Sequence, residues 1–242
     1  FIGCSGSKGS TFSMSQLNYS FSILRTSFEN CKNDKKLGNF FMITYQDDFL
    51  ESTVSFNECK FSFFESNSIE NGALRLTNEG EKLALTLIFE KTIFEHFYYS
   101  GDSLSAISFI GLVHLEISEC TFNNISSLGG DSISLSSDSK TIIEKCKFID
   151  CCSSGYAISS ASANELFIFD SIVRFNRNDK CRKCGGISVQ NSGKTEIENV
   201  QFVNTHTNPA LSIMQRSNLT CELIVSDCIF DSFSGSKCFD IQ

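Results

Sequence analysis

The stretch Leu-Glu-Ile-Ser-Glu-Cys-Thr-Phe at residues 115–122 decides the fold, because versions of it return along the whole chain. Residues 54–61 read Val-Ser-Phe-Asn-Glu-Cys-Lys-Phe, and residues 141–148 read Thr-Ile-Ile-Glu-Lys-Cys-Lys-Phe. If the last position of each copy is taken as an anchor, eight anchors follow one another at intervals of 25 to 33 residues. Self-similarity at such a period is the signature of a repeat architecture. The anchors are Phe28, Phe61, Phe94, Phe122, Phe148, Val173, Phe202 and Phe230.

Three further columns align when positions are counted backward from the anchor. Position −2 usually holds a small or thiol residue, and positions −5 and −7 hold apolar residues or threonine. Position −2 is Thr26, Cys59, Thr92, Cys120, Cys146, Ser171, Val200 and Cys228; position −5 is Ile23, Phe56, Phe89, Ile117, Ile143, Ile168, Ile197 and Val225; position −7 is Phe21, Val54, Leu87, Leu115, Thr141, Leu166, Thr195 and Leu223. Positions −7 and −5 alternate, as do −2 and 0, so each pair faces one side of a strand.

Two residues that are usually polar separate the two pairs, as in Asn57-Glu58 and Glu144-Lys145. They break the alternation, which predicts a corner or bulge. A third apolar strand follows each anchor by about ten residues, often after glycine, as at Gly155 to Ile158. Each repeat is therefore predicted to be three short strands joined by bends. We expect glycine to supply these bends, because it tolerates positive φ and the chain has a single proline.

Three short strands per repeat predict an all-β fold, a single-stranded right-handed parallel β-helix (solenoid) of about eight coils. In-register stacking would place like residues about 4.8 Å apart, so the anchors should form one internal ladder. We expect residues 1–242 to form one such domain, and the incomplete last repeat indicates an excerpt of a longer chain. A leucine-rich repeat is the main alternative, but it leaves the second apolar strand of each repeat unexplained.

Composition limits the classes of partner. Charged residues make up 20% of the chain and the formal net charge is −8, which argues against a nucleic-acid or anionic-membrane surface. No uncharged apolar run approaches the roughly 20 residues of a membrane helix, so no membrane segment is expected. A protein or glycan ligand on a surface remains the expected partner.

Two stretches resemble a known repeat family. Residues Cys120-Thr121-Phe122-Asn123-Asn124 followed by Gly129-Gly130, and Cys59-Lys60-Phe61 followed by Gly72-Ala73-Leu74, resemble polymorphic outer-membrane-protein repeats. That family carries G-G-A-I and F-x-x-N tetrapeptides on a right-handed β-helix of the pectate-lyase-like type. The resemblance implies that fold and a role in adhesion. Here F-x-x-N occurs at 64–67 and 175–178 rather than at the anchors, and Gly185-Gly186-Ile187 comes nearest to G-G-A-I.

Twelve cysteines suggest an oxidising compartment or a metal. Those at position −2 are predicted to be buried, inert thiols. Cys152 and Cys181 each lie six residues before an equivalent third-strand isoleucine, so they should sit on adjacent coils and form a disulfide. Zinc binding by these two together with Cys151 and Cys184 is the alternative.

Three N-x-S/T sequons begin at Asn18, Asn124 and Asn218, and each is a predicted N-glycosylation site if the chain is secreted. Together with the cysteines they favour an extracellular or cell-surface location.

Many right-handed β-helices are pectate lyases or polysaccharide hydrolases, so a carbohydrate-active enzyme is one candidate function. Glycoside hydrolysis needs two carboxylates roughly 5–10 Å apart, and Asp47-Asp48 is the only acidic doublet of the expected sort. The three histidines stand alone, and the basic group from Arg174 to Lys183 reads as a solvated loop. No catalytic, cofactor or metal site is expected. The sequence favours a non-catalytic surface or secreted segment for adhesion or structural assembly; the alternatives are a carbohydrate-active enzyme and an intracellular scaffold with reduced thiols.

Overall fold

The computed structural model describes most of the repeat region. The described residues are 12–15, 20–30, 32–33, 41–45, 52–66, 74–78, 85–100, 105–137, 140–161, 163–175, 184–190, 192–204, 208–214, 221–231 and 238–241.

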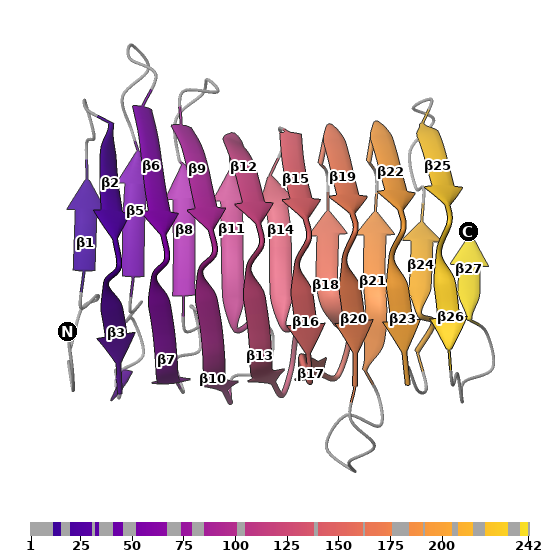
Figure 1. The fold of residues 1–242 in the computed structure, drawn as a ribbon, viewed down its shortest axis with the longest axis horizontal. Helices are drawn as coiled ribbons and strands as arrows, with labels where there is room; N and C mark the ends of the chain where they lie inside the picture. The colour runs from indigo at the N-terminus through magenta and orange to yellow at the C-terminus, as the bar shows by residue number, and fades with distance from the viewer. Residues whose placement is uncertain are drawn as a thin grey trace.

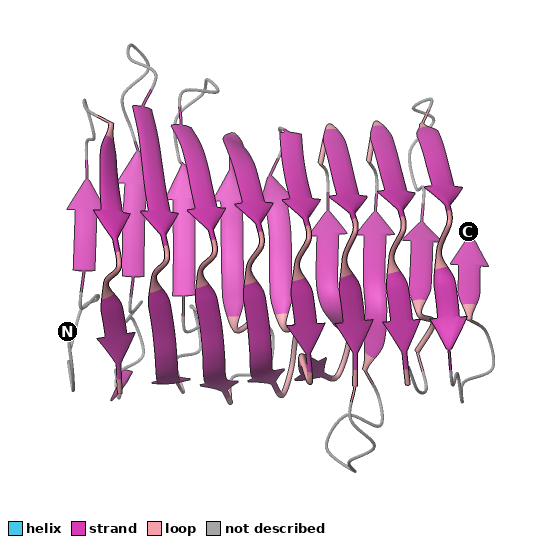
Figure 2. Cartoon of the chain, in the orientation of Figure 1, coloured by secondary structure: helices cyan, strands magenta, loops and turns pink. Residues whose placement is uncertain are grey.

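These residues form three parallel sheets that run the length of the molecule (Figures 1 and 2). Sheet 1 contains β2 (Phe21–Leu24), β6 (Ser52–Asn57), β9 (Leu85–Glu90), β12 (Val113–Ser118), β15 (Lys140–Glu144), β19 (Glu165–Phe169), β22 (Lys194–Glu198) and β25 (Glu222–Ser226). Sheet 2 contains β3 (Ser27–Glu29), β7 (Lys60–Ser66), β10 (Ile93–Tyr99), β13 (Thr121–Ser127), β16 (Lys147–Ile149), β20 (Ile172–Arg174), β23 (Gln201–Val203) and β26 (Ile229–Asp231), with the short strands β4 (Lys32–Asn33) and β17 (Cys152–Ser153) beside β7 and β13. Sheet 3 contains β1 (Phe12–Ser15), β5 (Phe41–Tyr45), β8 (Leu74–Asn78), β11 (Ile107–Gly111), β14 (Ile133–Ser137), β18 (Tyr156–Ala161), β21 (Gly185–Gln190), β24 (Leu211–Met214) and β27 (Phe239–Ile241).

The chain passes through sheets 1, 2 and 3 in turn and then begins the next coil one strand further along each sheet (Figure 1). Sheet 1 holds one strand from each of the eight repeats. Because a coil never pairs with itself, the sheets are held together by bonds between successive repeats. The predicted β-helix fold is confirmed, and the three strands per repeat are those expected from the sequence columns.

The anchor residues form one ladder inside sheet 2. Every anchor is paired in register with the anchor of the next coil, from Phe28 to Phe230. Ring centroids of successive phenylalanines lie 4.7 to 5.1 Å apart with nearly parallel planes from Phe28 to Phe148. Val173 interrupts the ring stack, which resumes with Phe202 and Phe230 at 5.0 Å. Parallel pairing of similar repeats places like residues beside one another, so an aromatic column with one break at Val173 runs along the core.

The first bend is made by charged and polar residues, so the expectation that glycine would supply the bends is wrong. Position −3 has φ between 48° and 54° in all eight repeats. Among the described residues, only one glycine, Gly111, has positive φ. The left-handed conformation is held by bonds between coils; for example, the Glu119 amide donates to the Glu144 carbonyl oxygen at 2.9 Å. These residues are Arg25, Glu58, Lys91, Glu119, Lys145, Asp170, Asn199 and Asp227.

A second bend lies two residues after the anchor. This position is described in seven repeats, and six of them have positive φ there, between 51° and 58°. Asn and Asp tolerate this conformation better than most residues, and they occupy four of the six positions. The side chains at this bend project from the corner of sheet 2. The residues are Asn30, Phe63, His96, Asn124, Asp150 and Asn204.

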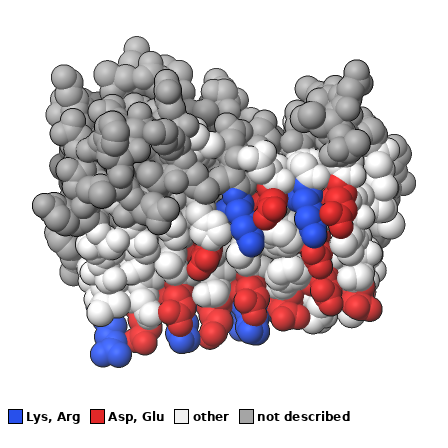
Figure 3. Space-filling model, turned by 90° about the horizontal axis from the view of Figure 1, so that it is seen from above, with Lys and Arg blue, Asp and Glu red and all other residues white. Residues whose placement is uncertain are grey.

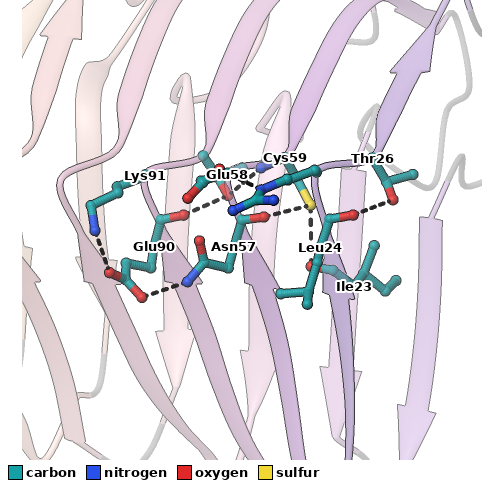
Figure 4. A network of polar contacts seen from close by, with 10 residues as sticks. Ile23, Leu24, Thr26, Asn57, Glu58, Cys59, Glu90 and Lys91 are labelled. Atoms are coloured by element: carbon teal, nitrogen blue, oxygen red, sulfur yellow. Dashed lines mark hydrogen bonds and ion pairs between the residues drawn. The ribbon is translucent and has the colours of Figure 1, made fainter.

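The hydrogen bonds made by the side chain at position −2 explain why the repeat prefers a hydroxyl or thiol just past the first bend. The Thr92 hydroxyl lies 3.2 Å from the carbonyl oxygen of Phe56 and 3.1 Å from that of Glu90, and it accepts the Cys59 amide at 3.4 Å. The Cys59 thiol points in the same way to the carbonyl oxygens of Ile23 and Asn57 (Figure 4). This side chain therefore satisfies buried backbone groups on two coils, and buried polar groups need such partners.

Candidate binding surface

The outward face of sheet 1 carries alternating charge in the C-terminal half of the solenoid. Lys140, Glu165, Lys194 and Glu222 are successive partners in register on β15, β19, β22 and β25. The Lys140 and Glu165 charges lie 4.0 Å apart, and those of Lys194 and Glu222 lie 3.7 Å apart. Figure 3 shows this row as alternating blue and red side chains. We call it the charge ladder.

An aromatic ring lies beside the charge ladder. The Nζ atoms of Lys140 and Lys194 lie 5.1 Å and 5.7 Å from the centroid of the Phe167 ring, so both cations sit within cation–π range. Phe167 and Phe169 both face outward on β19, with ring centroids 6.0 Å apart. This part of the face offers a half-buried apolar strip between charges.

Positions −4 and −3 form a second row along the first bend, which we call the bend ridge. Toward the N-terminus its acids are paired with bases: Arg25 with Glu58 at 2.9 Å, and Lys91 with Glu90 at 2.8 Å. After Lys145 the described ridge residues carry acids and no base, and Figure 3 shows the red side chains gathering at that end. The ridge consists of Leu24-Arg25, Asn57-Glu58, Glu90-Lys91, Ser118-Glu119, Glu144-Lys145, Phe169-Asp170, Glu198-Asn199 and Ser226-Asp227.

A surface hollow of about 350 Å³ opens on the bend ridge, lined by Glu144, Phe169, Asp170 and Glu198. Glu144 already pairs with Lys145 at 2.5 Å, and Asp170 accepts a hydrogen bond from the Asn199 side chain at 2.7 Å. One aromatic side chain among three carboxylates suits a cationic group, since the ring and the anions both attract positive charge. The hollow is the candidate site.

Sequence reasoning missed this hollow, because its residues come from three different coils. The search for carboxylates singled out Asp47-Asp48, which lies outside the described residues. A signal was available in the same columns that gave the fold. Reading positions −4 and −3 down the repeats, rather than along the chain, places Glu144, Asp170 and Glu198 on neighbouring coils.

Comparison with protein families decides the classification. The family described as "Right handed beta helix region" matches residues 51–230, well over half of the chain. The chain belongs to this right-handed β-helix family. No curated protein and no solved structure matches the chain.

The sequence predicts neither a membrane-spanning segment nor a metal site in this β-helix. None of the described ranges contains a helix with the length and hydropathy that a membrane crossing requires. Within those ranges, no group of three or more His, Cys, Asp or Glu side chains is arranged to hold a metal ion. His114 lies 2.9 Å from Glu116, and His96 contacts Asn124. His206 lies outside the described residues.

One buried carboxyl group of the β-helix lies away from the hollow. Asp131 accepts the Tyr156 amide at 2.7 Å, and burial raises the pKa of its carboxyl group despite hydrogen bonds from Ser159 and that amide. A Cβ added at Gly155 would lie 2.3 Å from the Asp131 carboxylate, so glycine is needed for this close approach. Asp131 thus joins two coils at the entrance to sheet 3.

The described cysteines include buried thiols, more exposed thiols near the last coil and one disulfide-bonded residue. Cys59, Cys120 and Cys146 are buried at position −2, as predicted, whereas Cys228 is only partly buried near the last coil. Cys152 is disulfide-bonded. Its predicted partner Cys181 lies outside the described residues, so that pairing stays a prediction. Cys151 and Cys184 are buried free thiols, and the Cys184 thiol donates to the Cys151 carbonyl oxygen at 3.1 Å.

We expect the thiols to react in two classes. Burial raises the pKa of Cys184 to about 12, and burial also raises the pKa of Cys59. At pH 8 the thiolate fraction of Cys184 would be about one ten-thousandth, and the thiolate is the reactive form. Cys221 and Cys238 are exposed, so iodoacetamide should label them first. Peptide mass mapping in buffer and in urea checks this; labelling of Cys184 in the folded protein at the rate of Cys221 would contradict it.

Only one of the three sequons falls on described residues. Asn124 is exposed at the second bend of β13, while Asn18 and Asn218 lie outside the described residues. Occupancy of all three stays a prediction.

Proposed function

We propose that this β-helix is a non-catalytic segment of a surface or secreted protein, and that the charge ladder and the hollow form its ligand-binding face. The observation that carries the proposal is the hollow, in which Phe169 lies among Glu144, Asp170 and Glu198. Three successive coils build it, so its carboxylates are spaced by the solenoid itself. A stiff, elongated surface of this kind suits adhesion or assembly with neighbours. The resemblance to polymorphic outer-membrane-protein repeats supports adhesion.

The negative charge of the hollow favours a cationic ligand. A lysine- or arginine-bearing protein segment, or a glycan with free amino groups, would place its cation over Phe169 and against the carboxylates. The same acidic ridge disfavours phosphate-rich partners. Cys152 in a disulfide supports an oxidising compartment, and hence an extracellular or cell-surface location over a scaffold with every thiol reduced.

We expect removal of the hollow's charge to weaken binding of a cationic probe. Oligolysine should bind the whole chain, and the Asp170→Asn/Glu198→Gln double variant should bind it about tenfold more weakly, equivalent to about 1.4 kcal/mol. The effect should shrink in high salt because screening weakens exposed charges. Biolayer interferometry at two salt concentrations measures this.

A matched control removes the same charge elsewhere. The Glu95→Gln/Glu29→Gln variant changes two acids on sheet 2, away from the ridge, and should retain wild-type binding. Equal losses in both double variants would mean that net charge, rather than the hollow, attracts the probe.

The location is tested on protein from its native source. Intact mass after thiol alkylation and glycosidase treatment should show a bridged Cys152 and glycan at one or more of Asn18, Asn124 and Asn218. Twelve free thiols and no glycan would favour the intracellular scaffold.

Polysaccharide cleavage is the second candidate, because three carboxylates line one hollow and glycoside hydrolysis uses carboxylate pairs. Release of reducing ends or unsaturated products from acidic polysaccharides, abolished by Glu198→Gln, would replace the binding proposal with catalysis.

A further inference from the structure

Sheet 2 exposes one aromatic residue on each of the neighbouring strands β7 and β10: Phe63 lies at the second bend, and Tyr98 lies two residues beyond the bend residue His96. The Phe63 side chain is 49% exposed and Tyr98 is 42% exposed. The Phe63 ring stacks on the His96 imidazole of the next coil, with centroids 4.7 Å apart and planes within 14°. Phe63 also has φ of 58°, a conformation that is uncommon for a bulky residue. The stacked Phe63 and His96 rings therefore leave a small aromatic surface open at this bend.

Asn124 continues the same column on the next coil. Its side-chain Nδ2 lies 2.8 Å from His96 Nδ1, so the amide is directed along the column toward the His96 and Phe63 rings. The residue is exposed, and it begins the sequon Asn124-Ile125-Ser126. Phe63, His96 and Asn124 therefore form one row, with a modifiable amide at its end.

We propose that Asn124 carries an N-linked glycan and that its first sugar covers the Phe63–His96 ring column. This rests on the proposed surface or secreted location, because the transfer machinery acts in that pathway. An asparagine amide has two hydrogens: one donates to His96 Nδ1, and the other is replaced by C1 of the sugar. The bound sugar then starts beside His96, where its apolar C–H face packs against the exposed rings.

The transfer is a substitution at the sugar's C1. The donor is a lipid-linked glycosyl diphosphate: the Nδ2–C1 bond forms as the C1–O bond to the diphosphate breaks, the diphosphate leaves with the electron pair, and Nδ2 loses one proton. In the folded chain Ile125 is fully buried, and the Ser126 hydroxyl donates to the Phe97 carbonyl oxygen at 3.4 Å. The sequon is thus locked into β13 after folding, so transfer must come before this coil closes.

The experiment uses the whole chain secreted from a eukaryotic host. Glycopeptide mapping should find Asn124 occupied in most molecules. The Ser126→Ala variant removes the sequon but keeps the Asn124 side chain and its contact with His96. It also removes the hydrogen bond from the Ser126 hydroxyl to the Phe97 carbonyl oxygen, so the unglycosylated wild-type chain from a bacterial host is melted beside it to give the cost of that bond alone. We expect this variant to bind more of a hydrophobic dye and to melt roughly 2–4 °C lower than the glycosylated protein. Trimming the glycan to a single N-acetylglucosamine should preserve the higher melting temperature.

The role of the ring column is tested by a double-mutant cycle. Phe63→Asn suits the positive φ and removes the ring, and the sequence around residue 63 gains no sequon. In that background, the difference in melting temperature between the glycosylated and Ser126→Ala forms should fall to less than half. An unchanged difference would overturn the covering of the rings.

The outcomes separate this inference from the proposed function. Secreted protein with a bridged Cys152 and a bare Asn124 would overturn the inference and leave the surface location standing. Reduced, unglycosylated protein from the native source would overturn the location, and the inference with it, even if the secreted chain were glycosylated in the host.

Discussion

Phe94→Ala is expected to lower the free energy of unfolding by about 3–5 kcal/mol, the range for truncating a buried phenylalanine. Phe94 is fully buried, and its ring lies between those of Phe61 and Phe122 at 5.1 Å and 4.7 Å. Phe89 meets it edge-on at 5.5 Å. The substitution therefore removes an apolar side chain from the middle of the ladder and leaves a cavity that two neighbouring coils cannot close, because their backbones are fixed by strand pairing.

Urea unfolding followed by circular dichroism measures this change. The adjacent Ile93 lies on the same strand and faces outward, and the residue is 38% exposed. Ile93→Ala is therefore the matched control and should lower the free energy of unfolding by less than about 1 kcal/mol. If both substitutions lower the free energy of unfolding by the same amount, the ladder does not stabilise the core as the structure indicates.

Glu119→Pro is expected to lower the free energy of unfolding by an amount similar to Phe94→Ala or larger, although Glu119 is exposed. Its φ of 53° is closed to proline, whose ring fixes φ near −65°. The substitution also removes the amide that donates to the Glu144 carbonyl oxygen at 2.9 Å. We expect a loss of about 3 kcal/mol or more.

The Glu119→Gly variant distinguishes the contribution of the backbone conformation from that of the side-chain charge. Glycine adopts positive φ without the cost of about 1–2 kcal/mol that a Cβ imposes there, so this variant should be as stable as wild type or more stable. Glycine at the preceding strand residue, Ser118→Gly, should instead lose about 0.5–1 kcal/mol. Thermal unfolding of the three variants gives the ranking; a Glu119→Gly variant less stable than Ser118→Gly would contradict the role assigned to this bend.

The first bend is a feature whose position the sequence predicts but whose residue type it does not. Two polar residues between two alternating pairs correctly located a corner at positions −4 and −3. Glycine was the expected bend residue because local preference favours it at positive φ, yet Glu119 and Lys145 adopt that conformation here. The reason is tertiary: each −3 amide from Arg25 to Asn199 donates a hydrogen bond to the next coil. These bonds fix the backbone whatever the side chain is, so the side chain is free to be charged.

The candidate site could be predicted less well than the fold. Glu144, Phe169 and Glu198 are far apart in the sequence and meet only because coils stack in register. Their spacing depends on strand pairing, and the hollow depends on the size and direction of side chains from three coils. Likewise, the Phe63–His96–Asn124 row needs the second bend, which the apolar columns do not mark.

The sequence by itself determined the coil, the direction in which each column faces, and the anchor ladder from Phe28 to Phe230. It could do so because parallel stacking of similar repeats turns a column of an alignment into a row of contacts. The tertiary structure alone decided which residues take the left-handed conformation and which side chains enclose the hollow. Those features depend on bonds and packing between coils, and a single repeat does not contain that information.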